Sequence, residues 1–238
     1  MSDKAYVLGV NRKRLEFAEK DADAIERILS SYGYDPVRLK ADKLAVLTEL
    51  DNMVDNSGPN DRVIFYYSGH GLLEGGTLHL LLTEDSERES SKLSITTIYE
   101  KLEKCRAAWK LLILDCCHAK AESLDWAARR SEKFLVLTAS KRLESAKELE
   151  SLQAGFLTYH LCRALEQPTA EILGKDGTLR INAVYDYLHK QALAYRGKTD
   201  TAEISLPDLT GDRSYNFPLG TLPDKAKATA PIPPLDIP

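Results

Sequence analysis

The sequence predicts an α/β fold in which a central, mostly parallel β-sheet is covered by helices on both faces. Apolar runs alternate with stretches of helical periodicity along most of the 238 residues. Apart from Arg62 and Lys110, the strongest runs, 62–67 and 109–114, are unbroken apolar stretches, as expected for strands that are buried on both faces. Hydrophobic residues form 43% of the chain and charged residues 29%, so one domain with a sizeable core is expected.

The first half of the chain predicts alternating strands and helices. The expected strands are 6–10, 36–39, 62–67 and 78–82, and the expected helices are 16–32, 42–54 and 95–105. Gly33 is expected to end the first helix, and Asp42 to cap the start of the second. The stretch 83–92 is expected to be a polar loop.

The second half continues the pattern, with strands at 109–114 and 134–138 and helices at 156–166 and 181–195. The stretch 119–133 is rich in charges and lacks clear periodicity, so it is expected to be a connection. Residues 221–238 hold five of the ten prolines, and proline disfavours both helix and sheet interiors. We therefore expect one domain over 1–220 and a linker or extended arm over 221–238.

Composition excludes several classes of protein. No apolar run approaches the roughly 18–20 residues that a membrane span needs. The net charge of −4 gives no reason to expect nucleic-acid binding. The first residues lack the order of a secretory signal, so a cytoplasmic location is expected. Four irregularly spaced cysteines without a C-x-x-C pair predict neither a disulfide scaffold nor a structural zinc site.

Two strand ends carry chemically active side chains. One reads Tyr67-Ser68-Gly69-His70-Gly71, and the other reads Asp115-Cys116-Cys117-His118. Sites in α/β sheets form beyond the carboxyl ends of the strands. A thiol and an imidazole at two such ends are the groups that a Cys/His nucleophile pair requires.

Strand alternation separates the two adjacent cysteines. Asp115 and Cys117 are expected on one side, and Leu114 and Cys116 on the other. A nearby carboxylate raises a thiol pKa, so Asp115 is a poor activator and is better understood as a group that binds a substrate cation. His70 is the expected partner of the thiol, and the Gly71 N–H is a candidate donor to a developing oxyanion.

These segments resemble the two catalytic motifs of the caspase and metacaspase cysteine peptidases. The motifs are Tyr66-Tyr67-Ser68-Gly69-His70-Gly71 and Leu112-Ile113-Leu114-Asp115-Cys116-Cys117-His118-Ala119. The likeness extends over roughly residues 4–219 and includes 15–22, 135–140 with Glu144 and Glu148, 155–158 and 206–219. It implies a caspase-like three-layer sandwich with a large-subunit-like part at 1–118, a connection at 119–133 and a small-subunit-like part at 134–220.

The resemblance also implies roles for individual residues. Cys117 matches the nucleophile and His70 the base, and the N–H groups of Gly71 and Cys117 match the oxyanion donors. Asp115 and Asp21 match acidic residues of the S1 pocket, although Asp23 competes with Asp21 for that role. Two carboxylates favour Arg or Lys at P1 of a protein or peptide substrate. No cofactor is needed, no metal site is expected, and a calcium requirement is left open.

The sequence departs from the family pattern at two places. Lys120 stands where glycine is common, and Cys116 stands where serine is common. Because such an enzyme cuts after basic residues, Lys120, Arg129, Arg130 and Lys133 in the connection are candidate autocleavage sites. Bacterial relatives of this type suggest activation by a protein partner, in stress or antiviral defence, with the proline-rich tail as a docking arm.

Two other functions stay open at this point. One is a proteolytically silent caspase-like scaffold or adaptor, which retention of both Cys117 and His70 argues against. The other is a metal-binding protein that uses Cys117, His118 and His70. The remaining candidates, Cys105, Cys162, His79, His160 and His189, are expected to be structural.

Overall fold

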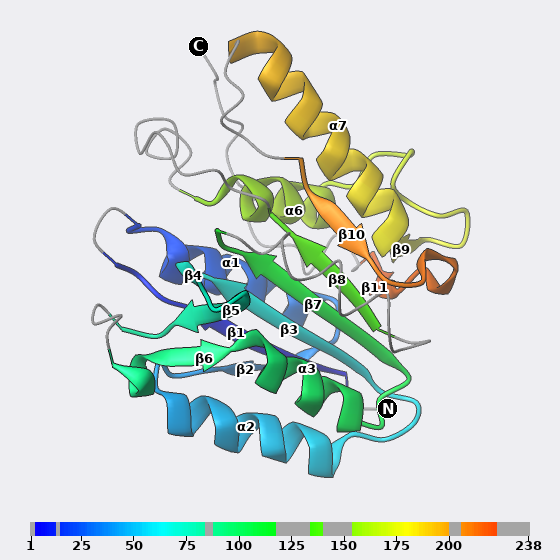
Figure 1. The fold of residues 1–238 in the computed structure, drawn as a ribbon. Coiled ribbons are helices and arrows are strands. Elements are labelled where there is room, and N and C mark those ends of the chain that lie inside the picture. Colours follow the sequence, from blue (N-terminus) through cyan, green and yellow to red (C-terminus); the bar gives the residue numbers. More distant parts are fainter. Residues whose placement is uncertain are drawn as a thin grey trace.

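A central β-sheet organises the molecule. The computed structural model describes residues 3–12, 15–83, 88–117, 134–139, 154–199 and 206–222. Within them, six strands form this sheet in the order β10-β8-β7-β3-β1-β2 (Figure 1). The strands are β1 (Lys4–Gly9), β2 (Asp35–Arg38), β3 (Arg62–Ser68), β7 (Trp109–Asp115), β8 (Phe134–Thr138) and β10 (Asp208–Thr210). All neighbours are parallel except β10, which runs antiparallel to β8.

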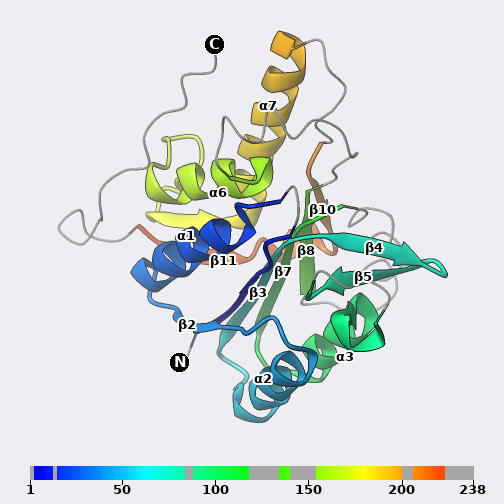
Figure 2. The same ribbon diagram turned by 90° about the vertical axis from the view of Figure 1, so that its left-hand side faces the viewer.

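Helices cover both faces of this sheet, as Figures 1 and 2 show. One layer contains α1 (Ala18–Ser31), α6 (Phe156–Glu166) and α7 (Ile181–Thr199), and the other contains α2 (Lys43–Asn56) and α3 (Ile95–Lys104). Each layer has its own apolar cluster against the sheet, and burial of these side chains stabilises the sandwich. The predicted three-layer α/β architecture is confirmed.

The first two helices have the predicted signals at their ends. Asp42 caps α2, because its carboxylate accepts a hydrogen bond from the Ala45 N–H at 2.9 Å. Helix α1 ends at Ser31, and Gly33 follows with a φ of 86°, a conformation that glycine adopts without strain. A side-chain cap such as that of Asp42 stabilises a helix by roughly 1 kcal/mol.

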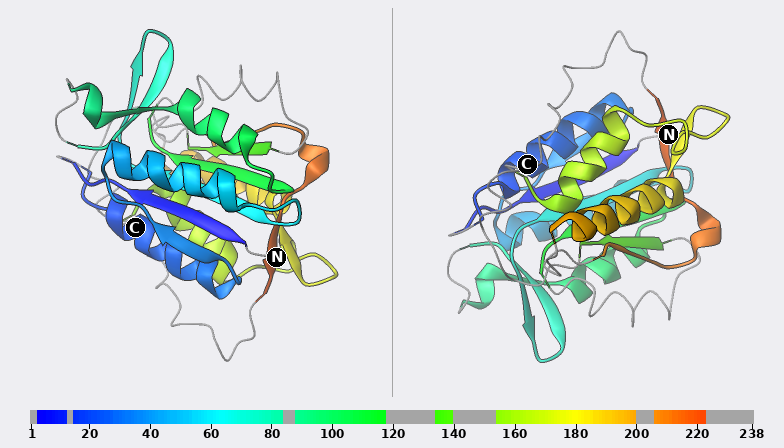
Figure 3. Two further views of the ribbon diagram at one scale, coloured as in Figure 1. Left: turned by 90° about the horizontal axis from the view of Figure 1, so that it is seen from below. Right: turned by 90° about the horizontal axis from the view of Figure 1, so that it is seen from above.

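Two smaller sheets were not predicted in full. Strands β4 (Gly71–Glu74), β5 (Thr77–Leu81) and β6 (Lys92–Ser94) form an antiparallel sheet, and the β4–β5 hairpin projects from the body (Figures 2 and 3). Strands β9 (Thr178–Arg180) and β11 (Pro218–Thr221) form a second antiparallel pair. The expected polar loop at 83–92 contains the 3₁₀-helix η1 (Glu89–Ser91) and the first residue of β6. A further 3₁₀-helix, η2 (Arg213–Tyr215), precedes β11.

Several predictions concern parts of the chain outside the described residues. These are His118, the connection 119–133 with Lys120, Arg129, Arg130 and Lys133, the residues Glu144 and Glu148, and the tail from 223 onward. The domain boundaries, autocleavage and docking through the tail therefore stay predictions, as does the cytoplasmic location. In the part of the chain that the structure describes, no helix is both long and apolar enough to cross a membrane.

Candidate active site

The two predicted motifs follow neighbouring strands of the central sheet. Strands β3 and β7 lie side by side (Figure 1) and are parallel, and their last residues, Ser68 and Asp115, are paired in register. Just beyond, the Gly69 N–H donates a hydrogen bond to the Asp115 carbonyl at 3.3 Å. The segments that carry His70 and Cys117 therefore leave the sheet side by side, at the carboxyl ends of its parallel strands.

A close backbone contact joins the two motifs. A β-carbon at Gly71 would lie 2.3 Å from the carbonyl oxygen of Cys117 and 3.4 Å from the sulfur of Cys116. A β-carbon does not fit so close to a carbonyl oxygen, so the two backbone segments can approach each other only because residue 71 is glycine. His70 directly precedes this contact and is half-buried. His70 and Cys117 thus belong to adjoining backbone segments, as the sequence predicts.

Exposure distinguishes Cys117 from the other three cysteines. Its exposed fraction is 9%, whereas Cys105, Cys116 and Cys162 are 1–2% exposed. Burial, with smaller contributions from nearby carboxylates, raises the pKa of Cys162 well above its ordinary value, which keeps that side chain a neutral thiol. Cys116 packs in the cluster on the α2 and α3 side, as strand alternation predicts. Of the four thiols, Cys117 is the one best placed to meet a substrate.

The two predicted substrate-binding carboxylates converge at the start of α6. The Gly155 N–H donates to both oxygens of Asp21, at 3.1 and 3.0 Å. Thr158 donates to Asp115 Oδ2 through its N–H at 3.2 Å and its hydroxyl at 2.8 Å. A β-carbon at Gly155 would lie 2.2 Å from Asp115 Oδ2 and 2.9 Å from Asp21 Oδ2. The structure therefore brings the two carboxylates to one point.

Both carboxylates are buried within the protein. Asp115 is 1% exposed and Asp21 is 3% exposed. Their oxygens lie at a helix N-terminus, where unsatisfied N–H groups stabilise negative charge. The competing candidate Asp23 is different, because its side chain is 72% exposed and pairs with Arg38 at 2.9 Å. Asp21, and not Asp23, shares a site with Asp115.

Hydrogen bonds through hydroxyl groups connect the acidic pair to strand β3. The sequence analysis did not predict these hydroxyl groups. The Ser68 hydroxyl donates to Asp21 Oδ2 at 3.0 Å, and the hydroxyls of Tyr66 and Thr158 lie 2.6 Å apart. A Gly-x-x-Thr sequence that opens a helix is a signal for a carboxylate partner, because threonine in a first turn supplies both an N–H and an O–H.

Comparison with known proteins assigns the family. The family model of the caspase domain matches residues 2–191, which is most of the chain. The chain belongs to the caspase-domain family. This membership supports a cysteine-peptidase role at the level of the family.

The fold of this caspase-domain chain also occurs in a solved structure of a distant protein. Protein GSU0716 from Geobacter sulfurreducens superposes with a TM-score of 0.60 at 15% sequence identity, over 93% of this chain and 100% of the other. At that identity the likeness supports the fold alone. No curated protein matches the chain.

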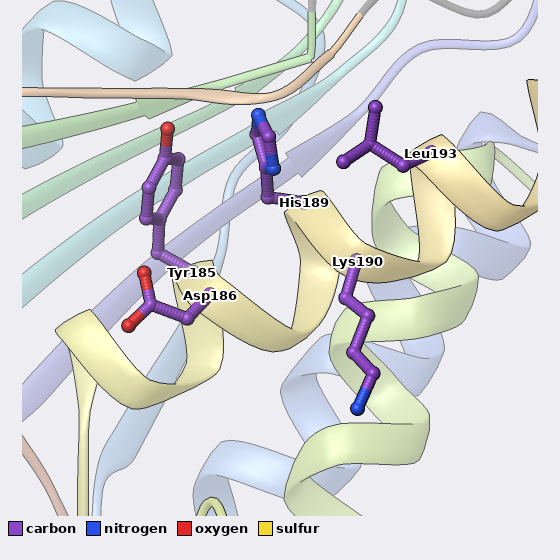
Figure 4. Close-up of a pocket in the computed structure, with 5 residues that line it drawn as sticks. All are labelled: Tyr185, Asp186, His189, Lys190 and Leu193. Carbon is purple, nitrogen blue, oxygen red and sulfur yellow. The ribbon is translucent and has the colours of Figure 1, made fainter.

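Two further histidines of this caspase-domain chain, His160 and His189, lie on helices α6 and α7. Burial, and next the charge of Arg163, lower the pKa of His160 to about 4, so its ring is neutral at ordinary pH. His189 lines a hollow of about 390 Å³ on α7, together with Tyr185, Asp186, Lys190 and Leu193 (Figure 4). None of the predicted site residues lines this hollow. Among the described residues, no three His, Cys, Asp or Glu side chains are grouped to hold a metal.

Proposed function

We propose that this protein is a cysteine endopeptidase that cleaves protein substrates after Arg or Lys, with Cys117 as nucleophile and His70 as its proton acceptor. The observation that carries the proposal is the backbone contact between Gly71 and Cys117, beside the most exposed of the four thiols. Membership in the caspase-domain family supports the same reaction class.

The proposed mechanism follows from these groups. His70 takes the proton from Cys117, and the sulfur attacks the carbonyl carbon of the scissile peptide bond. The N–H groups of Gly71 and Cys117 stabilise the tetrahedral oxyanion. His70 then gives the proton to the leaving amine, which departs as the carbonyl re-forms. Water, deprotonated by His70, hydrolyses the acyl-enzyme and releases the thiol.

The acidic pair is the proposed determinant of P1 specificity. Asp21 and Asp115 place two carboxylates at one point beside the strand end that carries Cys117. A guanidinium or ammonium group neutralises part of the charge of such a pair. The attraction is stronger for a buried pair than for a solvated one, because the local dielectric constant is lower. The carboxylate oxygens of Asp21 and Asp115 already accept hydrogen bonds from the N–H groups of Gly155 and Thr158. A P1 side chain that binds these oxygens must therefore share them with the N–H groups or displace the N–H groups.

A fluorogenic peptide panel with Arg, Lys or Asp at P1, measured with and without calcium, tests the proposal. We expect cleavage after Arg and Lys that is abolished in Cys117→Ala and unchanged in the matched variant Cys105→Ala. Asp115→Asn retains an acceptor for Thr158 but removes a charge. We therefore expect it to lower kcat/KM for basic substrates at least tenfold while the protein stays folded, since a charge-assisted hydrogen bond is worth roughly 1.5–3 kcal/mol.

The outcomes separate the parts of the proposal. A preference for Asp at P1 overturns the acidic pocket and leaves the Cys117–His70 pair in place. Equal background rates for the wild-type protein and Cys117→Ala on every substrate, in both calcium conditions, overturn the peptidase. That second result favours the silent scaffold or adaptor.

A further inference from the structure

Tyr67 has no role in the proposed chemistry, yet its hydroxyl lies directly against the backbone of His70. The side chain is fully buried at the end of β3. Its hydroxyl is 2.8 Å from the carbonyl oxygen of His70 and 2.9 Å from that of Leu81, so one proton is directed at both acceptors. The Leu81 N–H donates to the same His70 carbonyl at 3.0 Å. The peptide that follows the imidazole is therefore held by a side chain and by strand β5.

The ring of Tyr67 also fills the space beneath the motif. A β-carbon at Gly69 would lie 2.4 Å from the Tyr67 hydroxyl oxygen and 2.6 Å from the ring carbon that bears it. The phenol is thus packed against the backbone of the residue that precedes His70. Such close packing restricts the conformation of the side chain and so keeps the hydroxyl at these two carbonyl acceptors.

Electrostatics keep this hydroxyl a donor. Burial is the main cause that raises the pKa of Tyr67 well above its usual value, and the thiols of Cys116 and Cys117 raise it further. The phenol therefore stays protonated at ordinary pH.

We propose that Tyr67 is a positioning residue, whose hydroxyl holds the His70 peptide and so sets the orientation of the imidazole toward Cys117. This inference rests on the proposed function. Misplacement of a reacting group by about 1 Å can cost on the order of 100-fold in rate. The His70 carbonyl is fixed by groups of β3 and β5, so loss of the phenol's hydrogen bond leaves the Leu81 N–H to hold it.

Tyr67→Phe tests this proposal, because it removes one oxygen and keeps the ring. Tyr32→Phe is the matched control: its buried hydroxyl donates to the Leu165 carbonyl at 2.5 Å, at the far end of α1 from Asp21. Both variants lose a buried phenol-to-carbonyl hydrogen bond, so a comparable loss of thermal stability is expected. Circular dichroism melts confirm that both are folded.

Two measurements distinguish positioning from a structural effect. We expect Tyr67→Phe to lower kcat at least tenfold with KM within about threefold, whereas Tyr32→Phe keeps wild-type values. The pH dependence of Cys117 alkylation by iodoacetamide, followed by peptide mass spectrometry, reports the thiol–imidazole pairing without a substrate. We expect the Tyr67→Phe profile to move toward that of His70→Ala.

The results also separate this inference from the proposed function. If Cys117 alkylation responds to His70→Ala but Tyr67→Phe behaves like Tyr32→Phe, only the role of Tyr67 is overturned. If His70→Ala leaves the alkylation profile unchanged and the wild-type protein cleaves no substrate, there is no pair to position, and both proposals fall.

Discussion

At Gly155 the absence of a side chain allows two carboxylates to reach the start of α6. The nearest atoms to a β-carbon there are Asp115 Oδ2 and Asp21 Oδ2, which are both buried and hydrogen-bonded. Neither oxygen can retreat without losing a donor. The acidic pair therefore depends on a residue that carries no charge and takes no part in chemistry.

Gly155→Ala is expected to destabilise the protein by about 1–3 kcal/mol, the usual cost of forcing extra volume into a packed site. Gly58→Ala is the control, because its β-carbon would lie 3.4 Å from Asp61, an ordinary contact. Urea unfolding of both variants measures the difference. Equal unfolding midpoints for the two variants contradict the close packing at Gly155.

At this scale the sequence could identify the candidate site residues but not their hydrogen-bond partners. His70 and Cys117 follow apolar strands, and that position predicts their location. Asp21 and Gly155 are 134 residues apart, and nothing in the local pattern predicts their hydrogen bond. Tyr67 was missed because a tyrosine in a buried strand normally indicates packing alone.

Helix α6 gives a prediction at the scale of a single element. It begins at the acidic pair and carries His160 four residues later, against the rings of Phe156, Tyr159 and Tyr187. Burial, helped by Arg163, lowers the pKa of His160 to about 4. The unfolded chain binds this proton near pH 6.5, before the folded protein does, so stability falls as the pH drops from about 6.5 to about 4.

His160→Phe is expected to reduce this acid sensitivity. Between pH 7 and pH 4.5 the variant should lose about 2–3 kcal/mol less unfolding free energy than the wild-type protein, because it has no buried imidazole to charge. Urea titrations at the two pH values measure this, with His189→Phe, in the open hollow of α7, as control. Equal losses in the wild-type protein and His160→Phe would contradict a neutral, buried His160.

Most long elements were predictable from the sequence, and several short ones, such as β4, β6 and β9, were not. The central-sheet strands β1, β3, β7 and β8 are mostly apolar runs, which periodicity detects. Strand β4 has four residues, is partly exposed and shows neither run nor alternation. Its signal is the Gly75-Gly76 pair, whose positive φ values of 59° and 85° suit a two-residue hairpin turn. The hairpin matters for the proposed function because β4 begins at Gly71, a proposed oxyanion donor.

The arrangement of the whole molecule explains why the site lies where it does. The chain passes from β1 to β2 on one side and then to β3 on the other, so the strand order reverses between β1 and β3. Ligand sites in α/β sheets form at such switch points, beyond the carboxyl ends of the strands. Helix α1 follows β1 (Figure 1) and contains Asp21, and His70 follows β3. Cys117 follows β7, so three consecutive strands of the sheet supply the proposed site.

Covalent labelling tests the central claim most directly. The protein is incubated with an Arg-directed covalent inhibitor, and the modified peptide is identified by mass spectrometry. The account predicts a single adduct on Cys117, slower labelling in His70→Ala and no adduct in Cys117→Ala. Labelling that is absent from the wild-type protein, or that falls on Cys105, Cys116 or Cys162, would contradict it.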